Sequence, residues 1–128
     1  MHEIGYWEGG ITADTPTNPR SLYGVAKDAL RRSLFLALPE TEIAWLRCYY
    51  IYGDDRNNSS IFTRLLEAVD AGKAEMPFTT GANRYDFIRV EELGRQIAIA
   101  ATTAGFTGVI NCSTGVPVTL ADKVEGFI

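Results

Sequence analysis

The sequence is poor in the residues that build metal centres and disulfides. It has one histidine, His2, and two cysteines, Cys48 and Cys112, so a zinc site has almost no ligands and we expect no metal. The cysteines lie far apart along the chain and belong to no Cys-x-x-Cys pair. We predict two reduced thiols, each buried in a strand.

Long apolar runs and runs of one charge are also missing. No stretch reaches the roughly 18 apolar residues of a membrane span, and the first residues lack the basic and apolar regions of a signal peptide. The net charge is -4, with no lysine or arginine run, which argues against a nucleic-acid partner. We therefore expect a cytoplasmic protein with no membrane or nucleic-acid partner. Its 128 residues, 46% of them hydrophobic, could bury a small core.

One segment is suited to proton-transfer chemistry. Tyr23 and Lys27 form a Tyr-x-x-x-Lys pair inside Pro19-Arg-Ser-Leu-Tyr-Gly-Val-Ala-Lys27. A spacing of four places both side chains on one helix face, about one turn apart. A cation beside a phenol favours the phenolate, which can move protons near neutral pH. The spacing alone would equally fit a half-buried core tyrosine beside a solvated lysine.

The flanking residues predict the helix that carries this pair. Asn18 would cap the helix and Pro19 would occupy its first position. Apolar residues recur at three- and four-residue steps and predict a helix of about 20 residues with one apolar face; they are Leu22, Val25, Ala26, Ala29, Leu30, Leu34 and Leu38. Gly24 is costly inside a helix, so we expect something to pack against the backbone there.

Helices and strands alternate along the rest of the chain. Residues 43–52 are almost continuously apolar and predict a buried, parallel strand. A helix capped by Ser59 or Ser60 would close at Gly72, and a short strand would span residues 85–90. Glu91 and Glu92 favour the start of the next helix. Residues 109–112 predict a short strand, and a capping box from Thr119 to Asp122 predicts a last helix. This order predicts an α/β fold with a mainly parallel sheet.

Three motifs, in order, resemble extended short-chain dehydrogenase/reductases of the NAD-dependent epimerase/dehydratase family. The segment ending at Lys27 resembles Pro-x-Ser-x-Tyr-Gly-x-Ser-Lys, with Ala26 in place of Ser. Leu46-Arg-Cys-Tyr-Tyr-Ile-Tyr-Gly53 resembles Leu-Arg-x-x-Asn-x-Tyr-Gly. Arg84-Tyr-Asp-Phe-Ile-Arg-Val-Glu-Glu-Leu93 resembles Arg-Asp-Phe-Ile-His-Val-Asp-Asp-Leu. The resemblance implies a partial Rossmann-type parallel sheet with flanking helices and part of a small substrate-binding subdomain.

The resemblance also implies a set of site residues. Tyr23 would be the catalytic acid/base that exchanges a proton with a sugar hydroxyl while hydride passes to NAD or NADP, and Lys27 would support it and bind the cofactor ribose. Cys48 and Tyr49 would lie beside the nicotinamide, although core packing fits Cys48 equally well. Tyr50 and Tyr85 stand at positions that commonly touch the phosphates of a nucleotide sugar. Arg84 would be a phosphate ligand or a solvated turn residue.

One family feature is missing, since none of the 12 glycines falls in a Gly-x-x-Gly-x-x-Gly or Gly-x-Gly-x-x-Gly loop for a dinucleotide pyrophosphate. The family's catalytic Ser or Thr would fall upstream of Met1, and Thr12, Thr15 and Thr17 are interpreted as loop residues. We expect an inactive carboxy-terminal fragment of a sugar or nucleotide-sugar epimerase, dehydratase or reductase. The alternative is a non-catalytic binding module.

The same resemblance divides the chain into two regions. Residues 1–57 would belong to the dinucleotide-binding domain and carry the catalytic helix. Residues 58–128 would form part of a substrate-binding region, with helix 91–104 packing back on the first. Dimerisation through the helix that carries Tyr23 is common in that family, and Phe35 and Leu36 would contribute apolar contacts to a homodimer.

Overall fold

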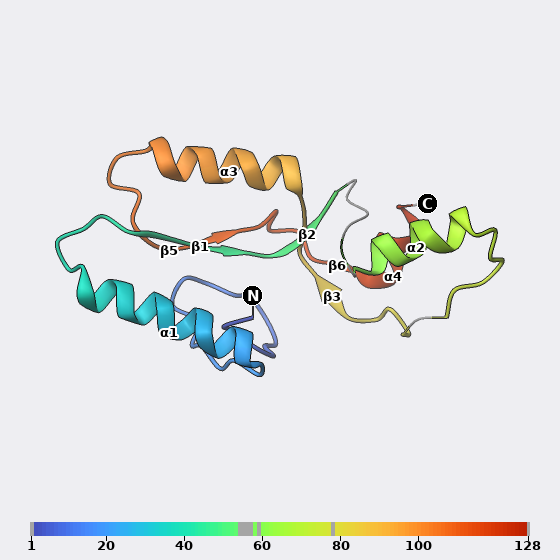
Figure 1. Ribbon diagram of the computed structural model, residues 1–128, viewed down its shortest axis with the longest axis horizontal. Coiled ribbons are helices and arrows are strands. Elements are labelled where there is room, and N and C mark those ends of the chain that lie inside the picture. The colour runs from blue at the N-terminus through green and yellow to red at the C-terminus, as the bar shows by residue number, and fades with distance from the viewer. Residues whose placement is uncertain (1, 54–57, 59, 78, 128) are drawn as a thin grey trace.

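The chain folds into short helices and strands in alternation (Figure 1). The computed structural model describes residues 2–53, 58, 60–77 and 79–127. The elements, in order, are α1 (Leu22–Ala37), β1 (Ala44–Cys48), β2 (Tyr50–Tyr52), α2 (Ile61–Asp70), β3 (Arg84–Tyr85), β4 (Phe87–Arg89), α3 (Val90–Thr102), β5 (Gly108–Cys112), β6 (Val118–Thr119) and α4 (Leu120–Glu125).

Three strand pairs organise the described residues. β1 and β5 are parallel, in register from Ala44 opposite Gly108 to Cys48 opposite Cys112. β2 and β4 are also parallel, whereas β3 and β6 are antiparallel. Helices α1 and α3 lie on opposite sides of the β1–β5 pair, and α2 and α4 lie together beyond β3 and β6 (Figure 1). The prediction of an α/β fold with mainly parallel pairing is confirmed.

The predicted single strand over residues 43–52 is wrong, because the chain changes partner within it. The Tyr49 N–H donates to the Cys112 carbonyl at 3.2 Å, but the Tyr50 N–H donates to the Asp86 carbonyl at 3.2 Å. β1 therefore ends at Cys48 and β2 begins at Tyr50. Nor is the second half buried, since Tyr50 and Ile51 are exposed.

The predicted strand over residues 85–90 divides for the same reason. Tyr85 pairs with Val118 in the antiparallel pair, whereas Phe87 pairs with Tyr50 in a parallel one. Asp86 is thus left between two strands that have different partners. The strand ends before Val90, which is the first residue of α3.

Helix α1 begins later than the asparagine and proline predicted. Ser21 is its N-cap, with an extended backbone and a hydroxyl that accepts from the Gly24 N–H at 3.1 Å. Asn18 is instead tied to the N-terminal segment, because its N–H donates to the Glu3 carbonyl at 3.0 Å. The helix still opens just before Tyr23, and it has 16 residues rather than about 20.

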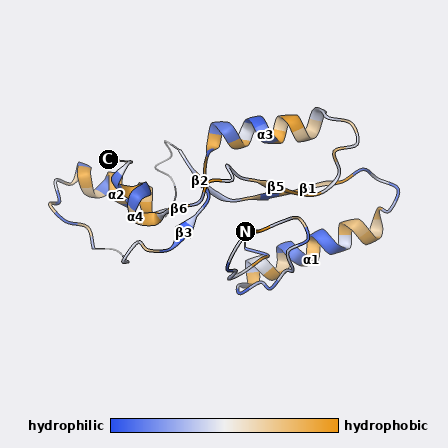
Figure 2. Ribbon diagram, turned by 180° about the vertical axis from the view of Figure 1, so that it is seen from behind, coloured by the Kyte–Doolittle hydropathy of each residue, from blue (hydrophilic) through white to orange (hydrophobic). Residues whose placement is uncertain are grey.

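The buried side of α1 is its polar side, and most of its apolar stripe is exposed. Gly24 and Asp28 are the buried residues of the helix, facing the N-terminal segment. Leu22, Val25 and Leu30 are exposed, Leu22 to 89%. Figure 2 shows apolar stretches along α1, at the outer edge of the molecule. The homodimer contact stays a prediction; Leu36 is exposed and Phe35 half-buried.

A close backbone approach explains Gly24, as the sequence predicted. A Cβ built there would lie 2.3 Å from the His2 carbonyl oxygen, which is backbone and cannot move aside cheaply. The N-terminal segment therefore lies directly on the first turn of α1. Gly94, within α3, has open space where its Cβ would be.

These two helical glycines should respond in opposite ways to alanine. Gly24→Ala should destabilise the protein, because the clash forces His2 away from the helix, whereas Gly94→Ala should stabilise it by about 0.5–1 kcal/mol through helix propensity. Denaturant unfolding of both variants measures this difference. Equal responses would contradict the close packing of His2 on α1.

The other helix ends follow the predicted chemistry. The Ser60 hydroxyl accepts from the Thr63 N–H at 3.2 Å to cap α2, and Gly72 closes that helix with φ 64°. Glu91 and Glu92 lie in the first turn of α3. The Thr119 hydroxyl accepts from the Asp122 N–H at 3.0 Å and opens α4. Of the two serines proposed for α2, Ser59 lies outside the described residues.

Two apolar clusters hold these elements together. One joins α2, β4 and α4 through Phe62, Leu65, Phe87 and Val124. The other joins β4, α3 and β5 through Ile88, Leu93 and Cys112, with Leu46 and Cys48 of β1 packed against it. Neighbouring residues of β4 thus face different clusters. The division at residues 57 and 58 stays a prediction.

Candidate active site

The Tyr23 and Lys27 side chains lie together on the exposed face of α1. The Lys27 Nζ is 5.6 Å from the centroid of the Tyr23 ring, and Tyr23 is 57% exposed. The His2 ring meets the Tyr23 ring edge-on, with centroids 5.1 Å apart. His2 thus places the N-terminal segment against the tyrosine while leaving the phenol accessible to a bound molecule.

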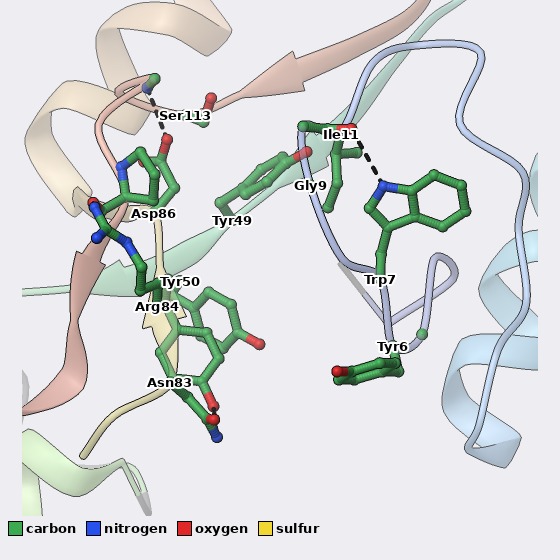
Figure 3. A pocket seen from close by; sticks show the side chains of 15 residues that line it. Tyr6, Trp7, Gly9, Ile11, Tyr49, Tyr50, Asn83, Arg84, Asp86 and Ser113 are labelled. Atoms are coloured by element: carbon green, nitrogen blue, oxygen red, sulfur yellow. Dashed lines mark hydrogen bonds between the residues drawn. The ribbon is translucent and has the colours of Figure 1, made fainter.

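A pocket lies where the parallel strands β1 and β5 end. Its volume is about 590 Å³. The N-terminal loop (residues 5–13) forms one wall, and residues in or next to the strands form the facing wall (Figure 3). The residues lining it are Gly5, Tyr6, Trp7, Gly9, Gly10, Ile11, Tyr49, Tyr50, Asn83, Arg84, Tyr85, Asp86, Ser113, Gly115 and Pro117.

Aromatic rings dominate the pocket walls. Figure 3 shows Tyr6 and Trp7 on one side facing Tyr50 on the other, with Tyr49 between the two walls. The Tyr50 and Tyr85 rings are tilted against each other with centroids 4.3 Å apart. Such rings offer flat apolar surfaces edged with hydroxyl groups, which suits a ligand that has both apolar faces and polar groups.

Partial burial raises the pKa of two of these phenols. It raises the pKa of Tyr50, with a smaller contribution from Tyr85, and it raises the pKa of Tyr49 against the opposing charge of Arg47. Both hydroxyls therefore carry their protons at neutral pH and can donate hydrogen bonds. Neither is suited to act as a base in the pocket.

Arg84 and Asp86 hold the loop that follows β5. The Arg84 Nη2 donates to the Pro117 carbonyl at 2.8 Å. The Asp86 carboxylate accepts from the Thr114 N–H at 2.8 Å, the Thr114 hydroxyl at 2.7 Å and the Gly115 N–H at 2.7 Å. These contacts fix the Ser113 and Pro117 side of the pocket. Arg84 is exposed and lines the pocket, but its Nη2 already donates to the Pro117 carbonyl.

Buried polar contacts anchor the N-terminal loop. Arg47 and Glu3 form an ion pair in which both are only 4% exposed. The Arg47 Nη1 also donates to the Ala13 carbonyl at 3.1 Å, and the Asn111 amide donates to the Ile11 carbonyl at 3.1 Å. The wall that carries Tyr6 and Trp7 is thus attached to both β1 and β5.

A second polar cluster ties the same segment to α1. The Asp28 carboxylate accepts from the Thr17 hydroxyl at 3.1 Å, from Arg31 at 2.8 Å and from Arg32 at 2.9 Å. Partial burial opposes ionisation, but these hydrogen bonds outweigh it and lower the pKa of Asp28. Thr12, Thr15 and Thr17 make local contacts here and in the loop, as expected of loop residues.

The lowered pKa gives Asp28 a defined pH signature. Its contribution to the free energy of unfolding is complete above the ordinary carboxyl pKa of about 3.9 and is lost as the pH falls through the lower folded value. Asp28→Asn should therefore cost about 1–3 kcal/mol near neutral pH and much less in strong acid. Denaturant unfolding at both pH values measures this, with the exposed Asp14→Asn as the matched control. An equal cost at both pH values would contradict the assignment.

The predicted site residues fall into two groups and one outlier. Tyr23 and Lys27 share a face of α1, and Tyr49, Tyr50, Arg84 and Tyr85 line the pocket. Cys48 does not line it, and is half-buried rather than buried, against the α3 side of β1. Sequence reasoning missed Trp7, Asn83, Asp86 and Ser113. Asp86 could have been found, since it lies within the third motif.

The chain combines parallel strand pairs, a Tyr-x-x-x-Lys pair on an exposed helix face and a pocket at the strand ends, and in these features it resembles the short-chain dehydrogenase/reductases. Residues 6–113 match the NAD dependent epimerase/dehydratase family, and the chain belongs to that family. It is 44% identical over 131 aligned residues to a dTDP-6-deoxy-L-talose 4-dehydrogenase (NAD(+)) from Aggregatibacter actinomycetemcomitans. The match covers 100% of this chain and 48% of that relative, so the chain spans about half of its length.

Solved structures share the fold at lower identity. UDP-glucuronic acid 4-epimerase from Bacillus cereus, in complex with UDP-glucuronic acid and NAD, superposes with a TM-score of 0.85 at 22% identity, covering 98% of this chain and 41% of that one. dTDP-glucose 4,6-dehydratase from Bacillus anthracis, in complex with NAD, gives 0.81 at 20% identity, covering 99% and 42%. Both confirm the Rossmann-like α/β fold class.

Across residues 2–53, 58, 60–77 and 79–127, no group of three or more His, Cys, Asp or Glu side chains is placed to hold a metal ion. In that same part of the chain, no helix has the length and hydrophobicity needed to cross a bilayer.

Proposed function

We propose that this chain supplies the proton-transfer helix and the substrate pocket of an NAD-dependent enzyme that oxidises or reduces a sugar carbon of a nucleotide sugar. The observation that carries the proposal is the Tyr23 and Lys27 pair on an exposed helix face. The N-terminal segment touches Tyr23 through His2, and a few residues later it forms a wall of the pocket. Acid/base group and pocket are therefore parts of one continuous structure.

The chain's own residues fit only part of a dinucleotide. The Tyr23 hydroxyl and the Lys27 ammonium lie on one accessible face, which suits the hydroxyl groups of a nicotinamide ribose. The sequence offers no glycine-rich loop for the pyrophosphate. NAD is favoured over NADP because the dehydrogenase relative is named for NAD(+). When bound, NAD would accept or return the hydride of the sugar carbon.

Tyr23 would handle the proton in this reaction. As the sugar hydroxyl becomes a carbonyl, its proton would pass to the Tyr23 oxygen, and in the reverse direction Tyr23 would return it. The Lys27 ammonium would bind a ribose hydroxyl on the same helix face. Tyr49 and Tyr50 keep their protons, so they would orient sugar oxygens by donating hydrogen bonds.

The pocket favours an uncharged ring over a phosphate. It offers aromatic faces to the apolar side of a sugar ring, with Asn83 and Ser113 as polar partners. The relative's name makes a dTDP-linked 6-deoxyhexose, oxidised at its fourth carbon, the substrate to test first.

A chimaera tests this proposal. The 128 residues replace their matching segment in the Aggregatibacter relative, and turnover of dTDP-6-deoxy-L-talose with NAD+ is measured. We expect NAD-dependent oxidation by the chimaera, and no NAD binding by the chain alone in calorimetry. A folded chimaera that binds NAD but does not turn over this substrate would contradict the substrate assignment. NAD binding by the chain alone would refute the expectation of an inactive fragment.

A further inference from the structure

The two cysteines, which the proposed function does not use, lie opposite each other in the sheet. Cys48 ends β1 and Cys112 ends β5, and they are register partners in the parallel β1–β5 pair. Both pack in the cluster on the α3 side, so their side chains leave the sheet on the same face. Residues that are 64 positions apart in sequence thus carry neighbouring thiols.

The spacing suits a covalent bond between them. Adjacent strands lie about 4.8 Å apart, which falls inside the Cα separation of about 4.4–6.8 Å found for disulfides. The pairing persists at this end of the strands, because the Tyr49 N–H donates to the Cys112 carbonyl at 3.2 Å. The neighbouring Cys48 thiol also helps to raise the pKa of the Cys112 thiol. Neither cysteine forms a disulfide in this structure.

The two thiols differ in accessibility. Cys112 is 2% exposed, whereas Cys48 is half-buried. Burial raises the pKa of the Cys112 thiol, and the neighbouring Cys48 raises it further, so Cys112 stays protonated. Cys48 is therefore the sulfur that a reagent in solvent meets first.

We propose that Cys48 and Cys112 form a dithiol modification site that a small-molecule disulfide converts into an internal disulfide. Cys48 loses its proton and attacks one sulfur of the reagent, whose S–S bond breaks and releases one thiol that takes up the proton. The Cys112 sulfur then attacks the Cys48 sulfur, and the second thiol leaves with the Cys112 proton. The protein sulfurs lose two electrons in total, and the reagent gains them.

This disulfide would lie next to residues that line the pocket. Tyr49 follows Cys48 directly, and Ser113 follows Cys112 directly, and both of these neighbours line the pocket. The disulfide would join β1 to β5 at the last paired residues before two pocket walls begin. The site is therefore adjacent to the pocket without being part of its lining.

Oxidised glutathione provides the test, with intact-mass measurement and peptide mapping of the purified protein. The folded protein should lose two hydrogens in mass and give one cross-linked pair of peptides, carrying Cys48 and Cys112. Cys112→Ser should stop at one glutathione on Cys48. Cys48→Ser should leave Cys112 unmodified until denaturant is added. Serine is close in size to cysteine, although at position 112 it places a hydroxyl group in an apolar cluster.

Three results would overturn the proposal. They are two glutathiones on the folded wild-type protein, no reaction of that protein, and equal reactivity of the two serine variants. The wild-type protein in denaturant is the internal control, because unfolding separates the thiols and should favour two mixed disulfides over the internal one. If a variant does not fold, the peptide map of the wild-type protein still decides the result.

Discussion

Tyr23→Phe in the chimaera should lower turnover by about 10²- to 10⁴-fold, the usual contribution of one acid/base group. The change removes a single hydroxyl from a side chain that is 57% exposed, so the fold loses no buried contact. The His2 ring can still meet a phenylalanine edge-on, as it meets Tyr23. The effect should therefore appear in the rate of the chemical step, with the unfolding midpoint unchanged.

Tyr52→Phe is the matched control for this experiment. It removes the same hydroxyl from a tyrosine in β2 that packs on Phe62 and under Lys123, away from the pocket lining. Turnover should be close to that of the unmodified chimaera. Equal turnover of the Tyr23→Phe and Tyr52→Phe variants would remove Tyr23 from the mechanism.

Arg47→Met should destabilise the protein by about 3–5 kcal/mol, because it leaves the Glu3 carboxylate buried without its main counter-ion. Glu3 is 4% exposed, and its other charged neighbour, Arg31, is 3.6 Å away. The same change removes the donor to the Ala13 carbonyl. The N-terminal loop should therefore loosen, and with it one wall of the pocket.

An exposed ion pair gives the comparison. Arg95→Met breaks the contact with Glu92 on the surface of α3, which should cost less than about 1 kcal/mol. Denaturant unfolding compares both variants, and the Glu3→Gln/Arg47→Met double variant should recover part of the loss because no buried charge remains. If Arg47→Met costs no more than Arg95→Met, the buried pair does not hold the loop.

The sequence predicted the order of elements well because that order depends on local chemistry. Ser60, Gly72 and Thr119 end or start helices through contacts with residues a few positions away. The same locality explains the failure at residues 43–52. Apolar character extends through the whole segment, but the change of partner between Tyr49 and Tyr50 depends on residues 86 and 112, which local patterns do not include.

The candidate site was predictable only where a motif marked it. The four-residue spacing of Tyr23 and Lys27 can be read from the sequence itself. The second and third motifs contain the other predicted pocket residues, which are Tyr49, Tyr50, Arg84 and Tyr85. Trp7 reaches the pocket through a loop whose path is set by Arg47 and Asn111, from distant strands. The exposed apolar face of α1 was missed because periodicity indicates that a face is apolar without indicating what covers it.

The pairing of β1 with β5 has a consequence for how the chain acquires its shape. Ala44 of β1 pairs with Gly108 of β5, so β1 leaves the ribosome well before its partner strand has been synthesised. Pairing over such a separation closes a long loop, which slows folding relative to helices that form from neighbours. The α1 helix can form early, whereas the pocket walls at Tyr49 and Ser113 form late. Mutations that weaken β5 should therefore reduce the yield of folded protein during synthesis.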